Sequence, residues 1–256
     1  MPGGFRRGVQ WGVDRVLSVG YGLMYDYIFE RFGPYQALRR EVLHAVEAAV
    51  PAGIERRDVR VLDVGCGPGN FSLMLAEAGF TVVGLDGYDA LVTLAQEKRR
   101  AQRLPNVAFK QGSLTENGPF PPEQFDQLIN IHFLYADSNP THVLRAAHRA
   151  LKPGGHAVFV NLTRRVPVWT TFQALKEARG LQSAVAALLW VLPNSLFETF
   201  RRQTGPHYWN EPEFRARLEE AGFEVADLRR TFFDDASLIA TARKPMPAAA
   251  AVQATG

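Results

Sequence analysis

Hydrophobic and polar positions follow two patterns that alternate along this chain. Short apolar runs bounded by glycine, proline or acidic residues predict buried strands at residues 59–64, 81–85, 107–110, 125–131, 156–162, 223–228 and 237–242. Apolar residues at helical spacing predict helices at residues 35–50, 71–79, 89–102, 140–151 and 212–221. Strand and helix alternate at the spacing of parallel βαβ units, so the chain is predicted to be an α/β protein.

The first predicted strand ends in a turn with glycine at alternate positions. Gly65, Gly67 and Gly69 follow the apolar run 59–64, and a helical pattern begins directly after them. Glycines allow a sharp turn and a close approach of a ligand to the main chain, and the start of a helix offers free N–H groups. The next strand ends on Asp86, where a carboxylate can accept hydrogen bonds from ribose hydroxyls. These features predict a nucleotide-like ligand.

The spacing of the glycines narrows the kind of nucleotide. A phosphate loop would need Gly-Lys-Ser/Thr, and no lysine stands here. The dinucleotide fingerprint Gly-x-Gly-x-x-Gly is also absent, because the third glycine comes one residue early and Asn70 stands at the fingerprint position. Gly-x-Gly-x-Gly, the acid Asp86 and the later stretch 151–155 (Leu-Lys-Pro-Gly-Gly) together resemble the class I S-adenosylmethionine-dependent methyltransferases. The resemblance covers residues 59–163.

The resemblance implies a fold and a cofactor. The expected fold is a Rossmann-like, seven-stranded, mostly parallel sheet with helices on both faces, and a late antiparallel pair of strands ends it. The expected cofactor is S-adenosylmethionine. Tyr88 could stack on its adenine ring, and Ser113 stands where related families often carry an acid. The candidate cofactor-binding residues are Asp63, Gly65, Gly67, Gly69, Asp86, Gly87, Tyr88, Ser113, Leu114, Asn130 and Tyr25.

Regions outside the central core predict a helical cap, a lid and a tail. We divide the chain into an N-terminal helical cap (1–57), a cofactor-binding core (58–163), a helical lid (164–210), the C-terminal part of the core (211–244) and a disordered tail (245–256). The element Tyr25-Asp26-Tyr27-Ile28-Phe29 resembles the cap of quinone and lipid methyltransferases, which makes Tyr21 and Tyr25 candidates for ligand contact. They could equally be packing aromatics.

Two histidines are candidates for a catalytic base. His132 follows the fourth predicted strand, and an imidazole titrates near neutral pH. His207, in Gly-Pro-His-Tyr-Trp, is the second choice. Both could instead be pocket-lining or surface residues. The candidate substrate-binding residues are Tyr21, Phe133, Trp169 and Tyr208.

Composition argues against several other classes. The net charge is +3 and no long basic run is present, so charge alone does not imply nucleic acid. Asn-Ile-His-Phe at 130–133 replaces the Asn/Asp-Pro-Pro-Tyr/Phe of many enzymes that methylate adenine or amide nitrogens. One cysteine, Cys66, permits no internal disulfide, and no metal site is expected.

The longest apolar run, 184–192, is shorter than the ~20 residues of a membrane-spanning helix. No signal peptide is visible. We expect a cytoplasmic protein.

The resemblance implies methyl transfer by in-line displacement, and the apolar residues of the predicted lid favour a small, hydrophobic acceptor: quinone-like, isoprenoid, polyketide or another natural product. An apolar lid with arginines at its rim also fits a phospholipid methyltransferase in peripheral contact with a membrane surface. A nucleic-acid methyltransferase is a second alternative and is disfavoured by the scattered charges. A nucleotide-dependent oxidoreductase and a binding protein without activity also stay open. The sequence leaves the acceptor atom and the oligomeric state open.

Overall fold

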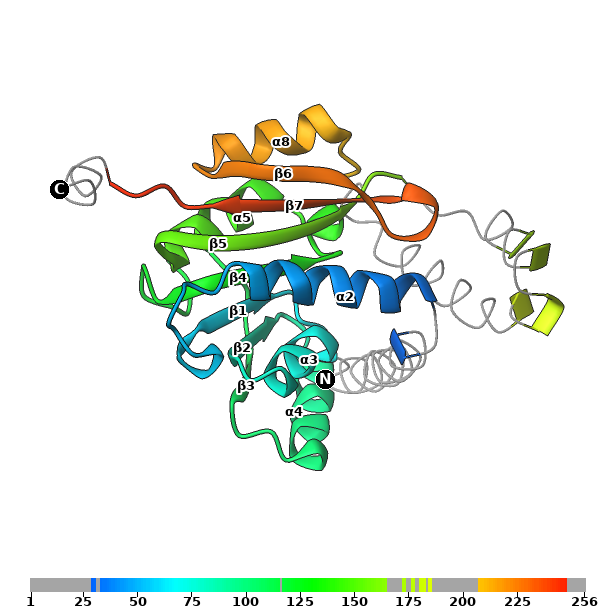
Figure 1. Cartoon of the computed structure of the whole chain (residues 1–256), viewed down its shortest axis with the longest axis horizontal. Coiled ribbons are helices and arrows are strands. Elements are labelled where there is room, and N and C mark those ends of the chain that lie inside the picture. The colour runs from blue at the N-terminus through cyan, green and yellow to red at the C-terminus, as the bar shows by residue number, and fades with distance from the viewer. Residues whose placement is uncertain are drawn as a thin grey trace, which may run out of the picture.

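A single sheet of seven strands organises the protein, in the order β3-β2-β1-β4-β5-β7-β6 (Figure 1). The computed structural model describes residues 29–30, 33–115, 117–164, 172–173, 176–177, 180–182, 184–185 and 207–247. The strands are β1 (Arg60–Val64), β2 (Thr81–Asp86), β3 (Val107–Gln111), β4 (Phe125–Ile131), β5 (Leu151–Leu162), β6 (Glu224–Thr231) and β7 (Ser237–Arg243). Strands β1 to β5 are parallel, and β7 runs antiparallel to both β5 and β6. The predicted mostly parallel sheet with a final antiparallel pair is confirmed.

Helices cover both faces of this sheet, as predicted. One face carries α2 (Gly33–Ala48), α3 (Asn70–Glu77) and α4 (Asp89–Gln102), and the other carries α5 (Pro140–Ala150) and α8 (Glu211–Glu220) (Figure 1). Successive strand residues face opposite ways: Val61 belongs to the core under α2 and α3, and Leu62 to the core under α5 and α8. The short 3-10 helices are η1 (Arg56–Asp58), η2 (Leu134–Ala136) and η3 (Phe233–Asp235).

Helix α2 is a layer of the core, although residues 1–57 were expected to form a cap. Its apolar side chains Leu38, Val42 and Val46 are completely buried against the sheet. Residues three or four apart share one face of a helix, so this spacing buries a continuous stripe. The part of the predicted cap that precedes Phe29, with Tyr21 and Tyr25, lies outside the described residues.

One predicted turn is wrong. The stretch Pro153-Gly154-Gly155 was expected to lead into a strand starting at His156, but β5 already begins at Leu151, which pairs with Phe125. The ladder between β4 and β5 shifts register between Phe125 and Gln127, so the proline and glycines fall inside an irregular strand. Local composition indicates a turn here, whereas pairing with β4 extends the strand.

The described residues include little of the predicted lid and tail. Most of 164–210, including Trp169, lies outside them, but Ala184 is completely buried and Phe172 packs with Phe233 of η3 around it. Residues 245–247 of the predicted tail follow β7, with Met246 beside Gly154, and the tail from 248 lies outside the described part. Within that part, no helix is long and apolar enough to cross a membrane.

Candidate cofactor and active site

The glycine turn after β1 is held by main-chain bonds to β2. The N–H groups of Gly65 and Cys66 both donate to the carbonyl of Leu85, at 2.8 and 3.1 Å. Gly65 and Gly69 have φ values of +74° and +81°, a region that residues with a Cβ atom rarely adopt. Gly69 is the N-cap of α3, so the turn leads directly into the helix whose first N–H groups face the carboxyl edge of the sheet.

Asp86, at the end of β2, joins this turn to the next loop. One carboxylate oxygen accepts the Gly67 N–H and the other accepts the Tyr88 N–H, both at 2.9 Å. The side chain is 6% exposed. The predicted Asp86 therefore lies directly beside the glycine turn.

Asp63 lies behind the turn. It is buried at the end of β1, and the Ser72 hydroxyl of α3 donates to its Oδ2 atom at 2.6 Å. Burial raises the pKa of Asp63 to about 7; the charge of Asp86 adds to the rise, and the Ser72 hydrogen bond opposes it. The hydrogen bond between Asp63 and Ser72 joins β1 to α3, the two elements on either side of the glycine turn, and so stabilises the turn.

The remaining predicted residues of β2 and β3 surround the same edge. Tyr88 is 42% exposed, Gly87 and Ser113 are exposed, and Leu114 is buried. The Gly112 N–H donates to the Asp86 carbonyl at 2.9 Å, which brings the loop after β3 next to the end of β2. This exposed edge can accept a flat ring against Tyr88.

Asn130 and Phe133 close the turn from the side of β4. The Asn130 amide donates to the Val64 carbonyl at 2.8 Å, while its Oδ1 atom is buried and has no hydrogen-bond partner in the described part. Phe133 lies against Gly65: a Cβ atom on that glycine would be 2.3 Å from the Phe133 Cδ2 atom. Phe133, predicted to bind substrate, therefore contacts the glycine turn.

The two predicted bases have different surroundings. The His132 ring lies between the Tyr35 hydroxyl, 3.3 Å from Nδ1, and the Ser237 hydroxyl, 2.8 Å from Nε2. Burial lowers the pKa of His132 to about 3, so the imidazole is neutral at physiological pH. His207 donates its N–H to the Tyr135 carbonyl at 2.7 Å and accepts at its own carbonyl from Asn161 at 3.1 Å.

Tyr208 stacks on Tyr135, with ring centroids 6.1 Å apart and an angle of 11° between planes. The segment 207–209 is thus attached to the residues that follow β4. Phe133, Tyr135 and Tyr208 give this end of the sheet an aromatic side. The role of His132 or His207 as a catalytic base stays a prediction.

Comparison with known proteins identifies the family. A family model described as a methyltransferase domain matches residues 32–228. The chain belongs to this methyltransferase family. The curated relatives it matches include ubiquinone biosynthesis O-methyltransferases from Pseudomonas syringae pv. tomato (36% identical over 105 residues; 41% of this chain and 45% of the relative) and Pseudomonas aeruginosa (31% identical over 169 residues; 66% of each). The chain thus spans less than half of the first relative's length.

Solved structures resemble this chain in fold. The [4+2]-cyclase SpnF has a TM-score of 0.61 at 21% identity, covering 85% of each chain. The CurJ carbon methyltransferase has a TM-score of 0.62 at 16% identity, covering 86% of this chain and 57% of that one. An S-adenosylmethionine-dependent methyltransferase from Aquifex aeolicus has a TM-score of 0.55 at 19% identity, covering 85% and 93%. One fold here carries different chemistries, so function must be argued from the site.

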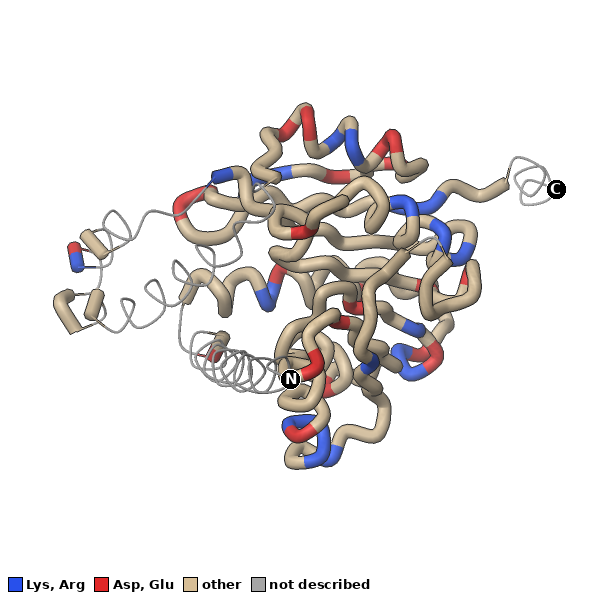
Figure 2. Tube along the Cα trace, turned by 180° about the vertical axis from the view of Figure 1, so that it is seen from behind, with Lys and Arg blue, Asp and Glu red and all other residues tan. Residues whose placement is uncertain are grey.

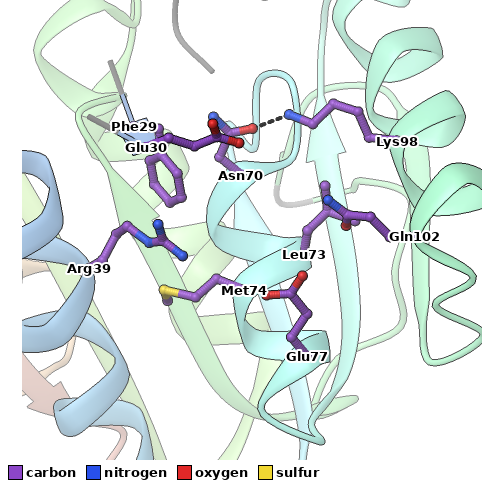
Figure 3. Close-up of a pocket in the computed structure, with 9 residues that line it drawn as sticks. All are labelled: Phe29, Glu30, Arg39, Asn70, Leu73, Met74, Glu77, Lys98 and Gln102. Atoms are coloured by element: carbon purple, nitrogen blue, oxygen red, sulfur yellow. Dashed lines mark hydrogen bonds between the residues drawn. The ribbon is translucent and has the colours of Figure 1, made fainter. Parts of the chain in front are cut away.

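A cavity of about 240 Å³ lies between α2, α3 and α4, and Asn70, the residue after Gly69, is part of its lining (Figure 3). The Arg39 guanidinium lies 4.5 Å from the centre of the Phe29 ring at one side, and Lys98 donates to the Asn70 side chain at the other. Glu30 and Glu77 add acidic groups to its lining. It contains none of the residues predicted to bind cofactor or substrate.

Sequence reasoning missed three residues around His132. Tyr35 stands within a helical pattern and looks like a core aromatic, whereas Phe232 lies in the turn between β6 and β7 and Ser237 is the first residue of β7. Phe232 has φ +60°, but no glycine marks this turn. The contacts join residues far apart in the chain, so no local signal in the sequence indicates them.

Proposed function

We propose that the methyltransferase binds S-adenosylmethionine at the glycine turn and transfers its methyl group to a small, hydrophobic, quinone-like acceptor. The observation that carries this proposal is the hydrogen bond between the glycine turn and the Asp86 carboxylate. Both Asp86 carboxylate oxygens are held by main-chain N–H groups, one from the turn and one from the loop after β2. An acid fixed in this way is well placed to accept two neighbouring ribose hydroxyls.

The residues at this edge fit the parts of the cofactor. A Cβ atom on Gly67 would meet nothing within 4 Å, so the main chain is open to a ligand there. The exposed Tyr88 ring offers a stacking face, and the buried Asn130 Oδ1 atom offers an unused acceptor. We assign the ribose to Asp86, the adenine to Tyr88, Ser113 and Leu114, and the amino-acid part to Gly65, Gly67 and Asn130.

The acceptor is assigned from aromatic surroundings and from relatives. Phe133, Tyr135 and Tyr208 lie where β4 ends, and Ala184 of the predicted lid packs with Phe233 beside the same edge. Relatives named for ubiquinone biosynthesis act, as that name says, in making a quinone. A flat, apolar ring compound suits such an aromatic setting. Tyr21, Tyr25 and Trp169 stay candidates for ligand contact.

In methyl transfer the main task of the protein is to orient two ligands. The bound cofactor supplies a methyl group that is already activated for displacement. Holding two reactants in a reactive arrangement can contribute roughly 7–11 kcal/mol. The glycine turn and Asp86 fix one reactant, and the aromatic side fixes the other. A base is needed only where the acceptor must lose a proton, which is the role predicted for His132 or His207.

The alternatives are weighed by charge. Lysines and arginines are interspersed with acidic residues over the described residues (Figure 2), whereas nucleic-acid binding predicts a continuous basic surface. At the rim of the predicted lid, Arg164 donates to the Asp234 carboxylate at 2.8 Å. A phospholipid acceptor at a membrane surface stays the first alternative, because the sequence of the predicted lid combines apolar residues with arginines. A cytoplasmic location stays a prediction.

The test uses methyl-labelled S-adenosylmethionine with three acceptors in parallel: a prenylated catechol, phosphatidylethanolamine vesicles and total RNA. We expect label in the catechol, extracted into organic solvent. Label in phosphatidylethanolamine would favour the alternative, and label in RNA would contradict the hydrophobic-acceptor proposal. An Asp86→Asn control should abolish most labelling; if it labels as well as the unaltered protein, the assignment of the cofactor site is wrong.

A further inference from the structure

Three side chains from distant parts of the chain form one continuous hydrogen-bond chain. Tyr35 of α2 contacts His132 Nδ1 at 3.3 Å, and Ser237 at the start of β7 contacts His132 Nε2 at 2.8 Å. The partners are 97 and 105 residues away from His132. Tyr35 is 3% exposed and Ser237 is completely buried. Both ring nitrogens of His132 therefore have partners within the protein.

The surroundings of the imidazole are aromatic. The Phe232 ring lies 4.8 Å from the His132 ring and 4.8 Å from the Tyr35 ring, both edge-on. Tyr35 is the titratable group that touches the imidazole. Two carboxylates on the neighbouring elements are paired with arginines: Glu41 of α2 with Arg229 at 2.7 Å, and Asp234 of the β6–β7 turn with Arg164 at 2.8 Å.

Among the described residues, no carboxylate is in hydrogen-bond contact with the His132 ring, whose two nitrogens contact Tyr35 and Ser237. Burial lowers the pKa of His132. Ser237 of β7 contacts the ring through an uncharged hydroxyl, and Ile131 and Val160, from β4 and β5, belong to the same buried apolar cluster as Tyr35. Protonating this imidazole would thus place an unpaired charge in an apolar setting.

The main chain at His132 is in an unusual conformation. Its φ is +52°, and its N–H donates to the Val160 carbonyl of β5 at 2.8 Å. Left-handed backbone at a residue with a side chain is strained and persists where the surroundings enforce it. The next residue is Phe133, whose ring lies on Gly65. The conformation at His132 thus directs Phe133 to the glycine turn.

The donors and acceptors of this chain can be assigned from their chemistry. A phenol is a stronger donor than an aliphatic hydroxyl, because its pKa is near 10. Tyr35 therefore donates to Nδ1, and the proton of the neutral imidazole stays on Nε2, which donates to the Ser237 hydroxyl. This arrangement uses the ring as an acceptor on one side and a donor on the other.

We propose that His132 is a positioning residue rather than the proton acceptor: Tyr35 and Ser237 hold its ring in one neutral tautomer, and the ring fixes the turn that places Phe133 on the glycine turn. The proposal rests on the proposed function, because it assigns His132 a part in cofactor binding. It links α2 and the start of β7 to the cofactor site. It leaves His207, the solvent or the acceptor's own acidity to account for any proton that is lost.

Paired variants separate the two roles. His132→Gln keeps a donor and an acceptor but cannot act as a base, whereas His132→Leu keeps neither; both carry the same backbone strain. We expect His132→Gln to retain turnover on the catechol to within about tenfold, as for one altered hydrogen bond. We expect His132→Leu to weaken S-adenosylmethionine binding at least tenfold. If both variants bind cofactor normally and both lose about 10²–10⁴-fold in turnover, His132 is the base and the proposal fails.

A second measurement does not depend on turnover. Nitrogen-15 NMR of the imidazoles should show His132 as the neutral Nε2–H tautomer from pH 5.5 to 8.5. Tyr35→Phe, which removes one hydroxyl, should change this tautomer signature, while Tyr135→Phe should leave it unchanged. Titration of His132 within this range would overturn the proposal. If the unaltered protein binds no S-adenosylmethionine, the proposed function fails, while the NMR result still decides whether His132 is held neutral.

Discussion

Phe133 and Gly65 are in such close contact that a Cβ atom on the glycine would lie 2.3 Å from the Phe133 Cδ2 atom. The contact joins the loop after β4 to the turn after β1. Gly65 also has φ +74°, so both its backbone and its surroundings exclude a side chain. This contact therefore fixes the aromatic residues after β4, where we place the acceptor, against the glycine turn, where we place the cofactor.

Alanine at the two glycines should separate clash from backbone strain. Gly67 has φ +52° with nothing within 4 Å of an added Cβ, so Gly67→Ala should cost about 1–2 kcal/mol of unfolding free energy. Gly65→Ala should cost clearly more in urea unfolding. Adding Phe133→Ala to Gly65→Ala should restore part of the loss. Equal losses for the two single variants would show that Phe133 does not pack on Gly65.

Asp63 should make stability fall as pH rises. Its pKa is raised to about 7, mainly by burial, from 3.8 when unperturbed. Between these values the folded state holds a proton that the unfolded state has released, so stability falls from about pH 4 to pH 7. Asp63→Asn removes this dependence, on the order of 4 kcal/mol at neutral pH. The urea midpoint of the unaltered protein should therefore fall relative to that of Asp63→Asn between pH 4 and pH 7, and the difference should stay constant above pH 7. Parallel curves across pH 4–8 would contradict this prediction.

His132 should act in the opposite direction. Burial lowers its pKa from 6.5 to about 3. Below pH 6.5 the unfolded chain gains a proton that the folded chain does not, so stability present above pH 6.5 is lost as pH falls toward 3. His132→Gln should show a shallower loss over this window in thermal unfolding at matched salt. The prediction fails if the acid side of the stability profile is unchanged in the variant.

Tyr88 should affect cofactor affinity and leave the fold intact. The side chain is 42% exposed, so Tyr88→Ala removes little packing. Loss of ring stacking at about 0.5–1.5 kcal/mol predicts S-adenosylmethionine binding that is weaker by roughly two- to tenfold in calorimetry. Tyr88→Phe keeps the stacking face and should bind as the unaltered protein does. Unchanged affinity in Tyr88→Ala would remove the adenine assignment.

The sheet could be predicted from sequence because its signals are local. The apolar run from Phe125 to Ile131 matches β4, and the helical pattern from Asp89 to Gln102 matches α4. Prediction failed at Leu151–Gly155, where pairing between Leu151 and Phe125 makes a strand of a stretch with the composition of a turn. Tertiary pairing there outweighs local preference.

The site divides in the same way. The sequence predicts the glycines of the turn and Asp86, because they lie within one strand–turn–helix unit and at the end of the next strand. These residues are Gly65, Gly67, Gly69 and Asp86. The partners of His132 were not found, since Tyr35 and Ser237 meet it only through the packing of α2 and β7. Such contacts depend on the folded arrangement of three elements, and no spacing in the sequence encodes them.

Calorimetric titration with S-adenosylmethionine tests the central claim most directly. Asp86→Asn puts an amide group against one of the two N–H donors that the carboxylate now accepts, and it removes the charge. We predict that the unaltered protein binds one equivalent, that Asp86→Asn binds at least about tenfold more weakly, and that Asp89→Asn, on the exposed first turn of α4, binds normally. Equal affinity for all three proteins, or no binding to the unaltered protein, would contradict the account.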